Sequence, residues 1–258
     1  MLIVLSPAKT LDYTSTATTD ARTRPAFMQH AARLVAILRA QSPAQLATLM
    51  KISDPLAQLN AQRYNDWSSR NSLSNSRQAV LAFNGDVYDG LQAGSMPQTQ
   101  LDYLQGHVRI LSGLYGVLRP LDTMQPYRLE MGTRLANDAG ADLYAFWGND
   151  VTTALAEALT PHRDQTIVNL ASQEYFRAVR PAFLRGKVVT PVFEDWNGGG
   201  YKIISFFAKR ARGAMARYAA SHNIRKAAQL QEFDTDGYAF DEQASDTVTW
   251  RFRRRSVN

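Results

Sequence analysis

Residues 166–176 read Thr-Ile-Val-Asn-Leu-Ala-Ser-Gln-Glu-Tyr-Phe, and the expected fold depends on the transition inside this stretch. The run from Thr166 to Leu170 is short, apolar and partly β-branched, which is typical of a buried strand. Ser172 then has the form of a helix N-cap. A strand end that leads into a helix is the usual place for a ligand in an open α/β sheet.

The same alternation of short strands and helices extends outward over the whole chain. Leu2 to Leu5 read as a buried strand that Ser6-Pro7 ends. Further β-prone runs lie at 79–83, 108–111, 187–193 and 201–204, helical patterns at 25–38, 98–106, 142–159 and 205–220, and a hairpin or edge strand at 238–252. We find no internal repeat and no linker. The sequence therefore predicts one α/β (mixed α+β) domain over 1–258, with a mixed sheet flanked by helices.

Composition sets outer bounds on the class of protein. The 258 residues include no cysteine, which excludes disulfides and iron–sulfur ligation and fits a reducing compartment, so we expect a cytoplasmic protein. The apolar run at the N-terminus is too short for a signal peptide or a membrane span, and we expect no membrane partner. The oligomeric state stays open, a monomer included.

The charge of the chain is positive and unevenly distributed. Lysine and arginine number 29 against 23 acidic residues, a net charge of +6, and no acidic residue lies between Trp196 and Gln231. On the expected helix at 205–220, an apolar stripe leaves the basic residues Lys209, Arg210, Arg212 and Arg217 on the other faces. Lys9 and Lys202 could extend the same surface. A solvated face is the plain alternative, but neighbouring like charges favour a bound polyanion.

A second basic feature is a predicted pair of helices at 43–67. Ser42-Pro43 and Ser53-Asp54-Pro55 each have the form of a helix start, and the apolar spacing from Leu46 to Ala57 matches a helix–hairpin–helix element. In such elements, backbone N–H groups point at one DNA phosphate. Lys51 and Ser53 stand where glycines are usual, and an ordinary helical hairpin has the same spacing.

Several polar residues come together in two other segments. The turn at 113–120 matches neither a P-loop nor a dinucleotide fingerprint. Candidate pocket residues here and at the 166–176 strand end are Tyr115, Arg119, Arg128, Asn169, Ser172 and Tyr175, with Glu130 and Glu174 as candidate acid/base groups. The four histidines lack metal-ligand spacing, so we expect no metal site and no cofactor.

Long blocks of the sequence resemble the bacterial YaaA family: Ser6-Pro-Ala-Lys-Thr-Leu-Asp12, residues 112–122 (SGLYGVLRPLD), 125–132 (QPYRLEMG), 169–176 (NLASQEYF) and 202–213 (KIISFFAKRARG). The resemblance spans essentially the whole chain. It implies a peroxide stress resistance protein that limits damage by free iron, with links to iron homeostasis and DNA repair. It also implies binding of duplex and branched DNA through a basic cleft and a helix–hairpin–helix element. It assigns no catalytic role to any residue.

Three hypotheses follow. The first is a non-enzymatic, sequence-tolerant DNA-binding protein, and the second is an enzyme acting on DNA or a nucleotide in a pocket formed by blocks 6–12, 112–132, 169–176 and 202–213. The third, direct iron binding, is disfavoured because cysteine is absent and histidine is unclustered. Convergence of these residues in one pocket, together with a carboxylate of perturbed pKa, would favour the second; the residues are Lys9, Arg128, Glu130, Ser172, Glu174 and Lys209.

Overall fold

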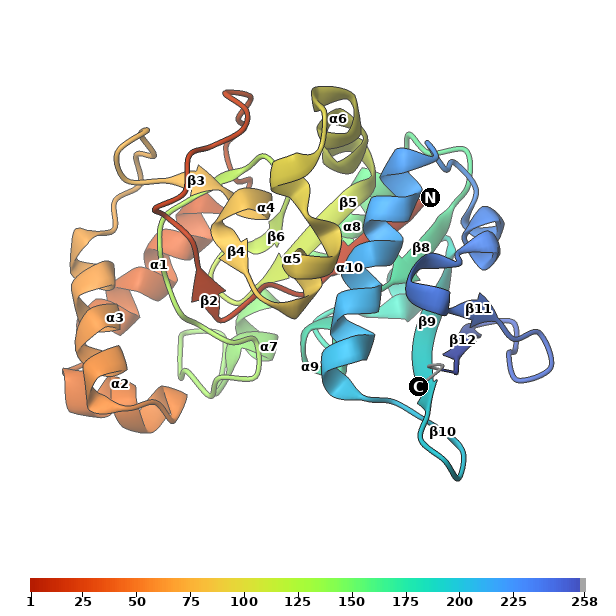
Figure 1. The fold of residues 1–258 in the computed structure, drawn as a ribbon. Coiled ribbons are helices and arrows are strands. Elements are labelled where there is room, and N and C mark those ends of the chain that lie inside the picture. The colour runs from red at the N-terminus through yellow and green to blue at the C-terminus, as the bar shows by residue number, and fades with distance from the viewer. Residues whose placement is uncertain (256–258) are drawn as a thin grey trace.

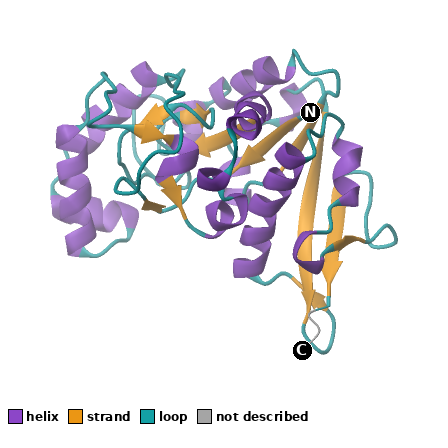
Figure 2. Ribbon diagram, turned by 45° about the horizontal axis from the view of Figure 1, so that its top comes forward, coloured by secondary structure: helices purple, strands orange, loops and turns teal. Residues whose placement is uncertain are grey.

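A mostly parallel sheet forms the centre of the protein (Figures 1 and 2). The computed structural model describes residues 1–255, and within them an eight-stranded sheet has the order β11-β12-β9-β8-β1-β5-β6, with β10 paired to β9. The strands from β12 to β5 run parallel. Their bounds are β1 Leu2–Leu5, β5 Val108–Ser112, β6 Gly116–Leu118, β8 Thr166–Asn169, β9 Lys187–Trp196, β10 Tyr201–Lys202, β11 Ala239–Phe240 and β12 Thr249–Arg254.

Strand β1 is the innermost element because all four of its residues are apolar and completely buried. It pairs with β5 on one side and with β8 on the other. The chain passes from β1 to β5 and only later returns to β8, so the order reverses between β1 and β8. Such a switch point leaves a crevice outside the carboxyl ends of the two strands.

Helices cover the sheet, and further helices extend the molecule beyond one side of it (Figure 1). Two small sheets join β2 (Thr10–Leu11) to β4 (Phe83–Asn84) and β3 (Arg77–Gln78) to β7 (Thr123–Met124). The helices are α1 Met28–Arg39, α2 Pro43–Met50, α3 Asp54–Asp66, α4 Ala79–Ala82, α5 Asp86–Leu91, α6 Gln98–His107, α7 Leu143–Trp147, α8 Asp150–Leu159, α9 Gln173–Phe176 and α10 Ser205–Ser221. No helix in residues 1–255 is long and apolar enough to cross a membrane.

Helix α10 crosses in front of the strands and packs against α5 without intervening side chains (Figure 1). A Cβ atom on Gly213 would lie 1.7 Å from the carbonyl oxygen of Val87, and one on Gly90 would lie 2.0 Å from that of Arg210. Only glycine permits this approach of two backbones. The contact places one side of α10 beside the strand-end crevice.

Most predicted elements are present, and two differ for physical reasons. Residues 79–82 form helix α4 instead of a strand. All four residues are apolar and buried, and the spacing of apolar residues does not distinguish a short buried strand from a short buried helix. The helical pattern at 142–159 is broken into α7 and α8 at Gly148, whose φ is 47°. The predicted alternation at 238–252 forms a hairpin of β11 and β12, and β12 also pairs with β9.

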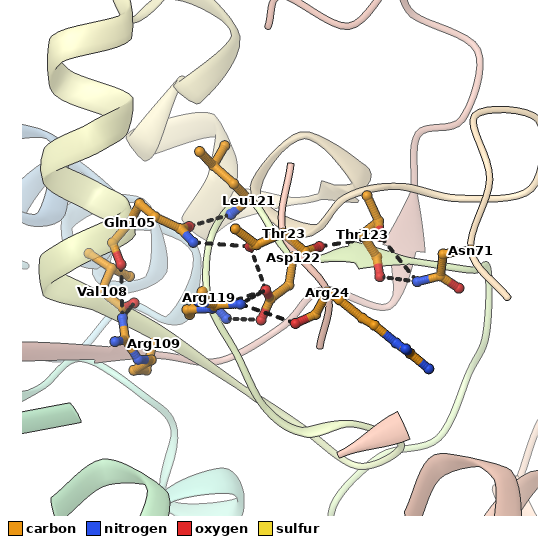
Figure 3. Close-up of polar contacts among 10 residues, drawn as sticks. All are labelled: Thr23, Arg24, Asn71, Gln105, Val108, Arg109, Arg119, Leu121, Asp122 and Thr123. Carbon is orange, nitrogen blue, oxygen red and sulfur yellow. Dashed lines mark hydrogen bonds and ion pairs between the residues drawn. The ribbon is translucent and has the colours of Figure 1, made fainter. Parts of the chain in front are cut away.

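The threonine-rich segment at residues 13–24 is attached to the core through Asp122 (Figure 3). The Asp122 carboxylate is almost completely buried and accepts hydrogen bonds from Thr23 Oγ1 at 2.6 Å and from the Arg119 backbone N–H at 2.8 Å. Arg119 also donates to the carbonyl oxygen of Arg24 at 3.1 Å. Arg119 therefore belongs to a structural cluster around Asp122.

The C-terminal arginines are largely neutralised by acidic residues of β9. Arg251 and Arg253 bind the buried carboxylate of Glu194 at 2.5 and 2.8 Å, and Arg254 pairs with Asp195. Within the described residues, these three arginines therefore belong to a partly buried ion-pair network. Residues 256–258 of the predicted domain lie outside them.

Candidate anion-binding site at the strand ends

A pocket of about 420 Å³ lies at the carboxyl ends of β1 and β8, where the strand order reverses. Its lining comes from the loop after β1, the start of α5, the segment before Met131, the start of α9 and helix α10. The lining residues are Ser6, Pro7, Ala8, Lys9, Thr10, Asn84, Gly85, Asp86, Val87, Glu130, Ser172, Glu174, Tyr175, Lys209 and Arg212.

Two serines join the strand ends at the floor of the pocket. The backbone N–H of Ser172 donates to Ser6 Oγ at 2.8 Å, and the two hydroxyl oxygens lie 3.3 Å apart. Ser172 also caps α9, as its place after the strand predicted. Tyr88 of α5 donates its hydroxyl to the Ser6 carbonyl oxygen at 3.1 Å. The loop after β1 is thus held to both α5 and α9.

Three cationic side chains line the pocket, Lys9 from the loop after β1 and both Lys209 and Arg212 from α10. Lys9 Nζ lies 2.9 Å from Glu130 Oε2, and Lys209 Nζ lies 3.4 Å from Asp86 Oδ2. More than half of each lysine side chain remains exposed, so both ammonium groups can also reach a ligand. Arg212 makes no ion pair with any carboxylate of residues 1–255.

The half-buried position of Arg212 sets it apart from a surface arginine. Burial lowers the pKa of its guanidinium, but arginine stays charged in proteins. Partial burial of a cation without a counter-ion has a desolvation cost, which an ion pair would offset. A bound anion would supply the missing partner and hydrogen-bond acceptors.

Both candidate carboxylates lie at the pocket, and each is held by neighbours. Glu130 accepts from Arg128 at 3.2 Å on one oxygen and contacts Lys9 on the other. Glu174 Oε1 accepts the backbone N–H of Gly132 at 2.9 Å, with Gly132 leaving room for the carboxylate. Burial raises the pKa of Tyr175 well above its ordinary value, so its hydroxyl stays protonated.

The structure therefore brings together most of the residues chosen from the sequence. Lys9, Glu130, Ser172, Glu174 and Lys209 line one pocket, and Arg128 touches it through Glu130. Arg212 and Tyr175 also line it. Sequence reasoning included Ser6 only as part of block 6–12 and missed Asn84 and Asp86, which nothing local in the sequence distinguishes.

Three candidate pocket residues lie elsewhere. Tyr115 is completely buried and accepts from Trp67 Nε1 at 3.0 Å. Asn169 is buried in β8 and caps the turn at Ala171. Arg119 belongs to the Asp122 cluster (Figure 3).

The other basic residues of α10 and β10 do not line the pocket. Arg210 lies 3.5 Å from Asp236, and Arg217 donates to the carbonyl oxygens of Leu91 and Gln92 at the end of α5. Lys202 is exposed on β10. The stretch from Trp196 to Gln231 contains no acidic residue, but acidic side chains from other segments, Asp86 and Asp236, lie close to its basic residues.

Helices α2 and α3 form the predicted helical pair at the opposite end of the molecule from β11 and β12 (Figure 1). Lys51 ends α2 in the left-handed conformation, with φ 52°, and Ser53 precedes α3. Both side chains are exposed. The DNA-contacting role of this pair stays a prediction.

Two histidines that are far apart in sequence pack together in space. The rings of His107 and His162 lie 4.5 Å apart, and burial lowers the pKa of His162 to about 4. Both ring nitrogens of His107 are engaged, by the Met1 carbonyl oxygen and by Arg225. Within residues 1–255, no three His, Asp or Glu side chains are grouped to hold a metal ion.

The fold and the site define an α/β protein with a cation-lined pocket at the switch point of a mostly parallel sheet. Residues 1–244 match the family described as peroxide stress protein YaaA. A UPF0246 protein of Janthinobacterium sp. (strain Marseille) is 62% identical over 255 residues, which are 99% of each chain. One from Ralstonia nicotianae is 60% identical over 257 residues, the full length of both. The chain belongs to the YaaA/UPF0246 family of peroxide stress proteins.

Proposed function

We propose that this protein binds DNA, holding a backbone phosphate in the strand-end pocket with Lys9, Lys209 and Arg212. The observation that carries the proposal is Arg212, a half-buried guanidinium that lines the pocket with no acidic partner in residues 1–255. A phosphate matches it well, because arginine donates two parallel hydrogen bonds to phosphate oxygens.

The helical pair α2–α3 supports a second contact with the same ligand. Lys51 is exposed at the turn between the helices. Helices α2 and α3 lie remote from α10 (Figure 1). We propose that it binds another phosphate along the duplex, as in a helix–hairpin–helix element. Contacts of this kind position a protein on DNA without reading bases, so binding should tolerate any sequence. In the cytoplasm under peroxide stress, such binding would limit iron-mediated damage to DNA.

We expect the affinity for duplex DNA to fall with salt, with a slope of log K against log salt of about −3 to −4. Four side chains, Lys9, Lys51, Lys209 and Arg212, would each neutralise about one phosphate. Fluorescence anisotropy with a labelled duplex across a salt series measures the slope, and a second duplex of unrelated sequence tests sequence tolerance. A slope near zero would contradict the proposal.

A second candidate function, an enzyme acting on DNA or a nucleotide, is favoured by the convergence of Glu130, Glu174, Ser6 and Ser172 on the cationic pocket. A pocket used only to hold phosphate has no need of carboxylates, which oppose an anion. Glu130 is placed beside Lys9, where it could accept or return a proton.

Glu130→Gln separates the two functions. If the protein only binds DNA, the variant should keep duplex affinity, or bind up to about tenfold tighter since one negative charge is removed. It should also restore peroxide survival to a bacterial strain that lacks its own family member. Retained binding with lost survival would instead support the enzyme. Glu242→Gln, at an exposed turn, is the matched control.

A further inference from the structure

Strands β9 and β10 and the first turn of α10 meet at one end of the sheet (Figure 1), and exposed apolar side chains lie on these segments. We call this cluster the aromatic tip; it consists of Trp196, Tyr201, Ile203, Phe206 and Phe207. The exposed fractions are 60% for Ile203, 53% for Phe206 and 37% for both Trp196 and Phe207. A group of large exposed apolar side chains marks a surface that meets a partner.

The rings of the aromatic tip are arranged in two pairs. The centroids of Trp196 and Tyr201 lie 5.2 Å apart, and those of Phe206 and Phe207 lie 5.6 Å apart. Each pair is steeply inclined, and the guanidinium groups of Arg255, Arg253 and Arg254 lie over the rings of Trp196, Tyr201 and Phe207. Phe206 is the ring of the tip that has no such cation over it among residues 1–255, and an exposed ring of this kind can accept a flat ligand.

Positive charge surrounds the tip. The Arg255 guanidinium lies 4.4 Å from the centroid of the Trp196 ring and has no carboxylate partner in residues 1–255. Lys202 is also exposed here. The nearest acids along β9, Glu194 and Asp195, are buried and already paired with arginines of β12. The exposed charge at the tip therefore complements an anionic partner that also has flat apolar faces.

The tip is continuous with the strand-end pocket along α10. Phe206 and Lys209 are three residues apart, so they share one side of the helix with about 4.5 Å between them along its axis. A chain of phosphates that enters the pocket at Lys209 would carry its next bases past Phe206. Single-stranded nucleic acids bind proteins in this way, with phosphates in a basic groove and bases stacked on aromatic rings.

We propose that the aromatic tip binds unpaired bases of single-stranded DNA by stacking, so that the protein prefers DNA with a single-stranded segment over a fully paired duplex. This proposal rests on the proposed function, because it extends the phosphate contact at Lys209 and Arg212. It adds a site, the tip, and a ligand class, unpaired bases.

Trp196 provides a direct reporter for this site. The other tryptophans, Trp67, Trp147 and Trp250, are at most 7% exposed, against 37% for Trp196. Titration with oligothymidylate should therefore quench the tryptophan fluorescence of the protein, and Trp196→Phe should remove the quenching. Phe206→Ala should weaken oligothymidylate binding about tenfold. Phe183→Ala, an exposed phenylalanine outside the tip, should leave it unchanged.

The outcomes separate this proposal from the DNA-binding proposal. If the protein binds duplex with the expected salt slope, but oligothymidylate gives no quenching and Phe206→Ala binds as the parent does, the tip proposal fails alone. If oligothymidylate quenches Trp196 while the Lys209→Glu, Arg212→Glu variant binds DNA as the parent does, the pocket contact of the proposed function fails alone. Self-association at micromolar concentration that Phe206→Ala abolishes would show that a second copy of the chain covers the tip, which overturns the proposal.

Discussion

A Lys209→Glu, Arg212→Glu double variant is expected to lose about 100-fold in affinity for duplex DNA at moderate salt. The two substitutions reverse the charges that α10 contributes to the pocket, and the new carboxylate at 209 would also lie beside Asp86. Both the lost attraction and the new repulsion act on an incoming phosphate. Anisotropy with a labelled duplex measures the loss, and circular dichroism checks that the fold is retained.

The matched control reverses two basic charges at the opposite end of the parallel strands, beside the amino end of β9. Arg185 and Lys187 are exposed at the start of β9, whereas the pocket lies beyond the carboxyl ends of its parallel neighbours. Arg185→Glu with Lys187→Glu changes the net charge equally and should reduce affinity much less. If Arg212→Glu unfolds the protein, the double variant Lys209→Gln, Arg212→Gln still removes both positive charges. A folded charge variant that binds DNA as the parent does would rule out the pocket as the phosphate site.

Gly213→Ala is expected to lower the melting temperature by about 3–10 °C, because a single methyl group would overpack the α5–α10 contact by about 1–3 kcal/mol. The new Cβ would meet the backbone oxygen of Val87 at 1.7 Å, and a backbone atom cannot rotate away as a side chain can. The helices must therefore separate, which also displaces Lys209 and Arg212 from the pocket. Thermal unfolding measures the first effect, and DNA affinity below the transition measures the second.

A glycine-to-alanine substitution should have the opposite effect on the melting temperature at Gly106, near the end of α6. A Cβ atom there meets nothing within 4 Å, and Gly106 is helical and exposed. Alanine favours a helix over glycine by up to about 1 kcal/mol, so Gly106→Ala should raise or preserve the melting temperature. Equal destabilisation by both variants would show that the close approach of α5 and α10 is not what Gly213 provides.

The sequence by itself determined the elements whose signals are local. The apolar runs at 2–5, 108–111 and 166–170 form β1, β5 and β8, and Ser42-Pro43 starts α2 with a capping box. Apolar period and capping act within one element, so neighbouring residues suffice to predict them. Motif blocks also placed Lys9, Glu130, Ser172 and Glu174 on a short list that the pocket unites.

Only the tertiary structure decided which charges are neutralised and which face the pocket. Asp86 pairs with Lys209 across more than a hundred residues, and Asp236 approaches Arg210 from another segment, although the stretch from Trp196 to Gln231 contains no acid. Arg212 differs from Lys209 and Arg210 because it is half-buried without a carboxylate partner in residues 1–255, whereas each of those two residues has one. Charge pairing and desolvation depend on distances between elements packed together in three dimensions, and the linear pattern of residues along one helix does not contain them.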